Sequence, residues 1–277
     1  MRPSEGPGSI DAPVRAFSYD LGATGPELTR AVAVEAPVQI VIGGAPFAVM
    51  MATPSDLEDF AVGFALTEQI AGNVSDIRGV EVEQVEDGWK LRIAISGERL
   101  QAHLARGRAM SGRTGCGLCG IEDFSQMPSP RPPLHSPAPI APEAIRAALS
   151  ELEAQQPLNQ ATRAVHAAAW CGRDGAIVLV REDVGRHNAL DKTIGALAHA
   201  GVAPHSGFFV ITSRCSFEMV AKAAIFGAGT LVSVSAPTSL ALERARRFGV
   251  RVIAIARRDQ ALCFEEGKDE ASGGLAA

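Results

Sequence analysis

Two pairs of alternating apolar segments in the first third of the chain predict β-hairpins. Residues 38–42 and 46–51 are mostly apolar and lie on either side of two glycines, Gly43 and Gly44. Residues 79–86 and 89–95 flank Asp87-Gly88, a strong signal for a two-residue turn. The first third therefore carries at least four strands.

A helix is predicted between these hairpins. Ser55 and Glu58 form a capping-box pattern, and Gly72 is a stop signal downstream. Apolar residues then repeat at helical spacing: Leu57, Phe60, Ala61, Phe64 and Ala65. Together with the hairpins, this helix makes residues 31–106 a small α+β domain.

The pattern changes after Pro142, where helical segments alternate with short apolar runs. The helices are expected near 143–156, 187–200, 216–227 and 239–248, and the runs at 176–180, 208–212, 231–234 and 250–256. Such alternation predicts an α/β domain over residues 143–264, with a mostly parallel sheet covered on both faces.

The remaining segments have compositions that predict little regular structure. Residues 1–30 are expected to be a loosely held arm and residues 265–277 a tail. Residues 107–142 combine a glycine-rich stretch with residues 126–142, of which seven are proline, and predict a loop and linker.

Composition narrows the classes of function. The formal net charge of −5 argues against a general nucleic-acid binder. No apolar run is long enough to span a bilayer, and the N-terminus lacks the apolar core of a secretory signal. We therefore expect a cytoplasmic protein that binds neither nucleic acid nor membrane.

Five cysteines in such a chain indicate thiols rather than a disulfide framework. Cys171 and Cys263 lie in or beside apolar stretches and are expected to be buried. Cys116 and Cys119 instead lie among glycines and polar residues.

Polar residues follow each apolar run of the α/β domain, where ligands of open parallel sheets bind. The segments are 181–188, 213–216, 235–239 and 257–260; three contain arginine, and three lead into a helix N-terminus, which favours phosphate. Taken singly, Ser213, Ser216, Ser235 and Thr238 are better explained as helix caps. Arg186, His187 and Arg214 together favour a phosphate-bearing ligand, and Asp183, Asp259, Ser235 and Thr238 are available for hydrogen bonds to its base or ribose.

The cysteine pair allows three interpretations. A zinc site would need two more ligands, such as His166, but the glutamate and proline of the nucleotide deaminase motifs are missing. A thioredoxin-like dithiol would open a helix, for which this segment is too rich in glycine. The setting favours a mobile loop that carries sulfur as a persulfide, with Arg113 stabilising the thiolate.

The run Arg181-Glu-Asp-Val-Gly-Arg-His-Asn-Ala-Leu-Asp-Lys192 resembles the signature of the formate dehydrogenase accessory sulfurtransferases, the FdhD family. Cys116-Gly-Leu-Cys-Gly120 resembles the cysteine motif of that family. Further blocks are similar at 35–37, 51–56, 213–218 with Lys222, and 234–239, so the resemblance covers about residues 30–260.

The resemblance implies a cytidine-deaminase-like larger domain and a homodimer. It also implies that sulfur passes from a cysteine desulfurase to the molybdenum cofactor, in its bis-guanine dinucleotide form, for use by formate dehydrogenase. Cys116 would carry the persulfide and Cys119 would assist. The residues implied to contact the cofactor are Asp183, Arg186, His187, Arg214, Ser216, Ser235, Thr238, Ile255, Ala256, Arg257, Arg258, Asp259 and Gln260.

Two other functions stay open at this point. The chain could be a non-catalytic chaperone that binds the guanine dinucleotide form of the cofactor, in which case neither cysteine would be needed. It could also be a zinc-dependent nucleotide hydrolase, in which case the cysteine pair would hold metal.

Overall fold

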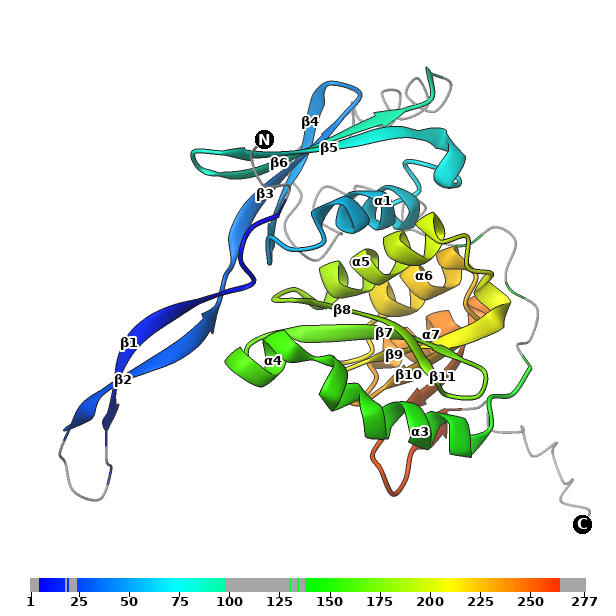
Figure 1. Ribbon diagram of the computed structural model, residues 1–277. Helices are drawn as coiled ribbons and strands as arrows, with labels where there is room; N and C mark the ends of the chain where they lie inside the picture. Colours follow the sequence, from blue (N-terminus) through cyan, green and yellow to red (C-terminus); the bar gives the residue numbers. More distant parts are fainter. Residues whose placement is uncertain are drawn as a thin grey trace, which may run out of the picture.

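The computed structural model describes residues 5–17, 19, 24–97, 130, 134 and 138–264. It shows three parts: a projecting hairpin, a small sheet with one helix, and a larger sheet with helices on both faces (Figure 1). Residues 265–277 and most of 107–142, predicted as a tail and a linker, lie outside the described part.

The small domain forms from the predicted hairpins. Its sheet has the order β4-β3-β6-β5, with the bounds β3 (Ala36–Ile42), β4 (Ala45–Ala52), β5 (Ile77–Val85) and β6 (Gly88–Ile95). Both hairpins are confirmed, and β3 pairs with β6 in parallel to join them. One face of this sheet packs on helix α1 (Leu57–Thr67), and a short 3-10 helix, η1 (Val74–Asp76), precedes β5.

Helix α1 begins and ends differently from its prediction. Its N-cap is Asp56, in a left-handed conformation with φ 52°, and no side chain caps the helix. The predicted capping box of Ser55 and Glu58 is therefore wrong. The helix ends at Thr67, before Gly72, because Gln69 takes up the left-handed conformation that closes the last turn.

The N-terminal segment is a β-hairpin rather than a loosely held arm. Strands β1 (Ser9–Phe17) and β2 (Thr24–Ala33) pair in antiparallel fashion and project away from the body (Figure 1). The long pairing register, from Ser9 opposite Ala33 onward, supplies the main-chain hydrogen bonds that composition alone does not predict.

The larger domain contains the predicted helices and strands together with two strands that the sequence pattern missed. Its helices are α3 (Pro142–Leu152), η3 (Glu153–Gln155), α4 (Pro157–Thr162), α5 (Arg186–His199), η4 (Pro204–Ser206), α6 (Phe217–Phe226) and α7 (Ser239–Phe248). Its strands are β7 (His166–Gly172), β8 (Ile177–Asp183), β9 (Gly207–Ile211), β10 (Thr230–Ser233), β11 (Arg251–Ala254) and β12 (Leu262–Phe264).

The sheet is mixed, which corrects the prediction of a mostly parallel one. Its order is β12-β11-β10-β9-β7-β8, and only the pairings of β10 with β9 and with β11 are parallel. The missed strand β7 lies between β8 and β9 and runs antiparallel to both, while β12 runs antiparallel to β11. Strands β8, β9, β10 and β11 therefore still point the same way.

Alternating side chains bury both faces of this sheet. Trp170 and Phe209 face the helices α5, α6 and α7, whereas Cys171 and Phe208 face α3. The two-residue period of each strand thus produces two cores, as the expected coverage of both faces requires. The cytidine-deaminase-like architecture stays a prediction.

Helices α1 and α5 join the two domains at very close range. A Cβ at Gly63 would lie 1.8 Å from Asp191 O, and one at Gly195 would lie 1.9 Å from Asp59 O. Only glycine allows the two backbones to approach this closely. The junction is therefore tightly packed.

Within the described ranges, no helix is long and apolar enough to cross a membrane.

Candidate functional site

Strands β8, β9, β10 and β11 all end at the same edge of the sheet. We call the surface formed by the segments that follow them the strand-end ledge; these segments are 181–188, 213–216, 235–239 and 257–260. Main-chain hydrogen bonds connect neighbouring parts of this edge: Thr212 N donates to Ala167 O in β7, Thr238 N to Cys215 O, and Ile255 N to Ser235 O. The missed strand β7 begins at this edge, with His166 opposite Asp183. The ledge thus brings together all the predicted strand-end segments.

Asp183 organises the end of β8 but is not available to a ligand. The side chain is fully buried, and its Oδ2 accepts from Thr53 N (3.0 Å) and Lys192 Nζ (2.7 Å). Its Oδ1 accepts from Gly185 N (2.7 Å) and Asn188 Nδ2 (2.9 Å). Because two donors occupy each oxygen, the carboxylate does not make the predicted contact with a base or ribose. It instead positions the backbone and side chains at the end of β8.

Lys192 and Thr53 complete this arrangement and link the ledge to the small domain. Lys192 Nζ also donates to Thr53 O (2.9 Å), and Val184 N donates to Thr53 Oγ1 (3.1 Å). Sequence reasoning missed both residues, because a lysine and a threonine give no local signal of complete burial.

Three buried polar atoms on the ledge have no hydrogen-bond partner among the described residues: Arg186 Nε, His187 Nε2 and Ser216 Oγ. Arg186 and His187 lie in the first turn of α5, and Ser216 is the N-cap of α6, where its hydroxyl does not cap the helix. Buried polar groups are normally paired, because leaving one unpaired costs about 1–3 kcal/mol. These atoms therefore fit a ligand with acceptor oxygens.

Arg214 adds positive charge to the same edge, and His166 lies beside it. Burial lowers the pKa of His166, and the positive charges of Arg186, His187 and Arg214 lower it further. A neutral imidazole at this position keeps one nitrogen as a hydrogen-bond acceptor.

Glu218 balances part of this charge. Its Oε2 lies 3.9 Å from His187 Nε2, beyond hydrogen-bond distance but close enough for an ion pair with protonated His187. Burial alone would raise the pKa of Glu218, but the neighbouring His187 and Ser216 side chains outweigh it and lower the pKa to about 2. The carboxylate was not singled out from the sequence, although it follows Ser216 by two residues.

The other end of the ledge is more exposed. Thr238 caps α7 through Ala241 N (3.3 Å), as expected for a helix cap. Ala256 is buried and its N–H donates to Ser233 O, whereas Asp259 and Gln260 are exposed. Arg257 donates to the carbonyl of Val234, and Arg258 extends toward Glu153 at 3.8 Å. Arg258 thus points to the α3 side of the sheet.

Ile255 is the most strained residue of the ledge. Its φ of 52° lies in the left-handed region, which is very unusual for a β-branched side chain. The hydrogen bond from Ile255 N to Ser235 O holds this conformation between the ends of β10 and β11. Such strain is concentrated at functional sites.

The cysteines separate into three groups. Cys116 and Cys119 lie outside the described residues. Cys171 is buried, as expected, and burial raises its pKa and that of Cys215 to about 12. Cys263 is exposed on the edge strand β12, so the prediction that it is buried is wrong.

The described part of the chain contains no cluster of three or more metal ligands.

Comparison with known proteins decides the family. Residues 33–269 match the FdhD/NarQ family. The chain belongs to the FdhD/NarQ family. A protein of Xanthomonas euvesicatoria named sulfur carrier protein FdhD is 47% identical over 251 residues, covering 91% of this chain and 88% of its own. Proteins of the same name from Cupriavidus necator and Chromobacterium violaceum are 47% and 48% identical, over 82% and 86% of this chain.

A solved structure has the same fold as this chain. The crystal structure of a formate dehydrogenase accessory protein from Desulfotalea psychrophila matches with a TM-score of 0.70. The match covers 94% of this chain and 98% of the other at 24% sequence identity. At that identity the likeness shows the fold alone.

Proposed function

We propose that this chain is an accessory sulfur carrier for formate dehydrogenase. It accepts sulfur from a cysteine desulfurase as a persulfide on Cys116 and passes it to the molybdenum cofactor in its bis-guanine dinucleotide form. The observation that carries the proposal is the set of buried donors without a hydrogen-bond partner at Arg186, His187 and Ser216, on a ledge built from three helix N-termini.

The chemistry of the ledge suits a pyrophosphate-bearing substrate. Guanidinium, imidazole and hydroxyl groups donate to phosphate oxygens, and the N-termini of α5, α6 and α7 add main-chain N–H groups. The cofactor would thus be held by its nucleotide end, and Ser235, Arg257 and Gln260 would contact the guanosine. FdhD relatives that are named sulfur carriers support the same role.

The sulfur steps balance with thiols alone. The Cys116 thiolate attacks the outer sulfur of the persulfide on the desulfurase, and the cysteine thiolate of the desulfurase leaves. The Cys119 thiol can then attack the inner sulfur on Cys116, which forms a Cys116–Cys119 disulfide and releases the outer sulfur as hydrosulfide. The two cysteines supply the two electrons that reduce the sulfur.

Intact mass measurement tests the carrier step. The full chain is incubated with a cysteine desulfurase and cysteine without reductant, and wild type is compared with Cys116→Ala and Cys119→Ala. We expect a gain of about one sulfur atom that a reductant removes. Cys116→Ala should abolish the gain.

Cys263→Ala is the matched control, because Cys263 is an exposed cysteine remote from the proposed carrier loop in sequence. This variant should gain sulfur like wild type. A gain that survives Cys116→Ala but is lost with Cys263→Ala would contradict the assignment. The absence of any gain, with guanine nucleotide still bound, would instead favour the non-catalytic chaperone.

A further inference from the structure

A carboxylate lies among the ledge donors that, in the proposed function, bind phosphate. Glu218 is in the first turn of α6, two residues after Ser216, and its side chain is 15% exposed. Its Oε2 lies 3.9 Å from His187 Nε2, a nitrogen without a hydrogen-bond partner among the described residues. Burial alone would raise the pKa of Glu218, but His187 and Ser216 lower it to about 2, so the group is charged at neutral pH.

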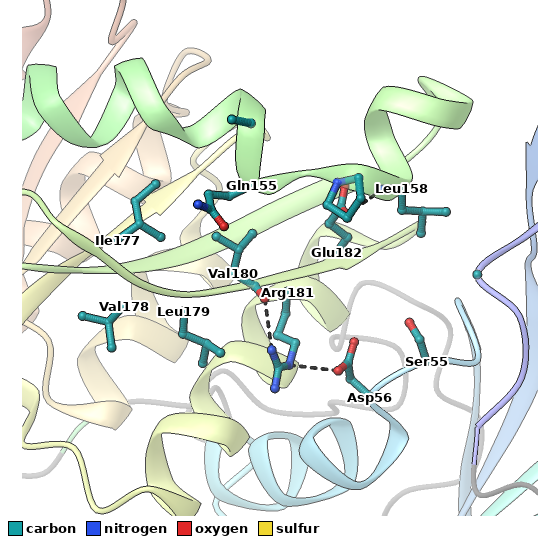
Figure 2. Close-up of a pocket in the computed structure, with 13 residues that line it drawn as sticks. Ser55, Asp56, Gln155, Leu158, Ile177, Val178, Leu179, Val180, Arg181 and Glu182 are labelled. Carbon is teal, nitrogen blue, oxygen red and sulfur yellow. Dashed lines mark hydrogen bonds and ion pairs between the residues drawn. The ribbon is translucent and has the colours of Figure 1, made fainter.

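Other cations of α5, α6 and β8 are paired with different carboxylates and do not neutralise Glu218. This holds for Lys192 and Lys222, whose ion pairs are 2.7 and 2.9 Å long. It also holds for Arg181, whose guanidinium Figure 2 shows turned to Asp56 at 3.1 Å. The cationic partner of Glu218 is instead a histidine, which is charged only when protonated. The carboxylate therefore contributes negative charge to the part of the ledge proposed to bind an anion.

The position of Glu218 brings this charge close to any ligand that His187 holds. A hydrogen bond from His187 Nε2 places the ligand oxygen about 2.8 Å from that nitrogen. The oxygen then lies within about 7 Å of Glu218 Oε2, whichever direction the hydrogen bond takes. At an effective dielectric constant of about 20, each extra negative charge on the bound phosphate should weaken binding about ten-fold or more.

Phosphate groups of nucleotides differ in that charge. A terminal phosphate has a second pKa of about 6 and carries nearly two negative charges at neutral pH. A phosphate that is esterified on both sides carries one. A carboxylate at the position of Glu218 therefore repels a terminal phosphate more strongly than an internal one.

We propose that Glu218 is a specificity-determining residue, which makes the ledge prefer a pyrophosphate esterified at both ends to one that ends in a free phosphate. The inference rests on the proposed function, because it requires that the ledge binds the pyrophosphate of a nucleotide. The preferred class of ligand is a dinucleotide or another pyrophosphate diester. A free nucleoside diphosphate carries its extra charge next to Glu218 and binds more weakly.

Calorimetric titration of the full chain with GDP and with its β-methyl ester tests the proposal, at about pH 8 and with a chelator that removes magnesium. The two probes have the same guanosine, and the ester lacks one negative charge on its outer phosphate. Wild type should bind the ester about ten-fold or more tightly than GDP. Glu218→Gln should bring the two affinities within about two-fold of each other, mainly because GDP binds more tightly.

Three further variants show whether charge at this position is the cause. Glu218→Asp keeps the charge and should keep the preference for the ester. Glu243→Gln removes an exposed carboxylate on α7 and should leave the wild-type ratio of affinities unchanged. Glu218→Gln in a His187→Gln background should narrow the ratio in the same way as in the wild-type background. Thermal unfolding of each variant verifies that it is folded.

Equal affinities of wild type for GDP and the ester would overturn the proposal, as would a ratio that Glu218→Gln leaves unchanged. A change of ratio that disappears in the His187→Gln background would also overturn it, because Glu218 would then act through the charge of the histidine. In each of these cases nucleotide binding by the ledge would still stand. If neither probe bound, the nucleotide part of the proposed function would fail together with this inference, whereas the mass measurement reports sulfur loading of Cys116 separately.

Discussion

The domain junction and the strand-end ledge both bury polar side chains, but three polar atoms on the ledge lack the hydrogen-bond partners that those at the junction have. At the junction, Lys222 Nζ lies 2.9 and 3.0 Å from the two oxygens of Asp191, and Thr67 Oγ1 donates to the same carboxylate at 2.7 Å. On the ledge, Arg186 Nε, His187 Nε2 and Ser216 Oγ are buried without a hydrogen-bond partner in the described structure.

This difference separates polar groups that hold the fold from those that, in the proposed function, bind a ligand. Paired groups at the junction fix how the two domains meet, because breaking such a pair leaves an uncompensated charge. Polar groups on the ledge that lack hydrogen-bond partners lower the stability of the free protein. A bound ligand that supplies acceptors would restore this stability. The following predictions test this distinction from the largest expected effect to the smallest.

Lys192→Met should destabilise the fold most, by about 3–5 kcal/mol, because it leaves the buried Asp183 carboxylate without its cation. Urea unfolding measures the loss. Lys90→Met, on β6, removes a lysine that is only half-buried and should change stability by less than about 1 kcal/mol. Equal losses would show that Asp183 does not depend on Lys192.

Glu218 should make stability depend on pH in the acid range. Its folded pKa of about 2 lies below its ordinary value of 4.5, so its contribution is present above pH 4.5 and is lost as the pH falls toward 2. The expected loss is about 2–3 kcal/mol. The free energy of unfolding, measured at several pH values from 7 to 2, should therefore depend less on pH for Glu218→Gln than for wild type. Glu243→Gln, on the exposed side of α7, should keep the wild-type dependence on pH.

Arg186→Gln should weaken ligand binding while leaving the stability of the fold nearly unchanged. Because Arg186 Nε has no partner to lose, the free energy of unfolding should stay within about 0.5 kcal/mol of wild type. Affinity for GDP, used as a probe, should fall about 10- to 100-fold in calorimetric titration. Arg246→Gln on α7 is the control and should keep the wild-type affinity. If Arg186→Gln lost stability but kept its affinity for GDP, the Arg186 side chain would have a structural role instead.

Gly195→Ala should lower stability by about 1–3 kcal/mol, because its Cβ would meet Asp59 O at 1.9 Å and push α1 from α5. Gly79→Ala is the matched control, since a Cβ there meets nothing within 4 Å. Thermal unfolding compares the two. A fully stable Gly195→Ala chain would mean that the junction can separate without loss.

Ile255→Gly should have the smallest effect on stability, about 1 kcal/mol in either direction. Glycine relieves the left-handed strain at φ 52° but loses the partly buried side chain. Ile253→Gly, two residues earlier in β11, lacks that relief and should destabilise much more. A similar large loss in both variants would show that the conformation of Ile255 is not strained.

The local pattern of the sequence determined most of the helices and strands, and it determined where polar segments follow them. Alternation predicted both hairpins of the small domain, and the order of apolar runs predicted that four strand ends share one edge. The long run from Arg181 to Lys192, together with the cysteine motif, indicated the FdhD family. These features depend on neighbouring residues, so they can be predicted without a tertiary structure.

Only the tertiary structure decided which polar residues are hydrogen-bonded within the fold and which lack hydrogen-bond partners. Asp183 was predicted to contact a ligand, but Thr53 and Lys192 occupy one of its oxygens, and Gly185 and Asn188 occupy the other. The position of β7 between β8 and β9 likewise made the sheet mixed. Hydrogen bonding and strand pairing over long sequence separations decide such outcomes, and the local pattern of side chains does not encode them.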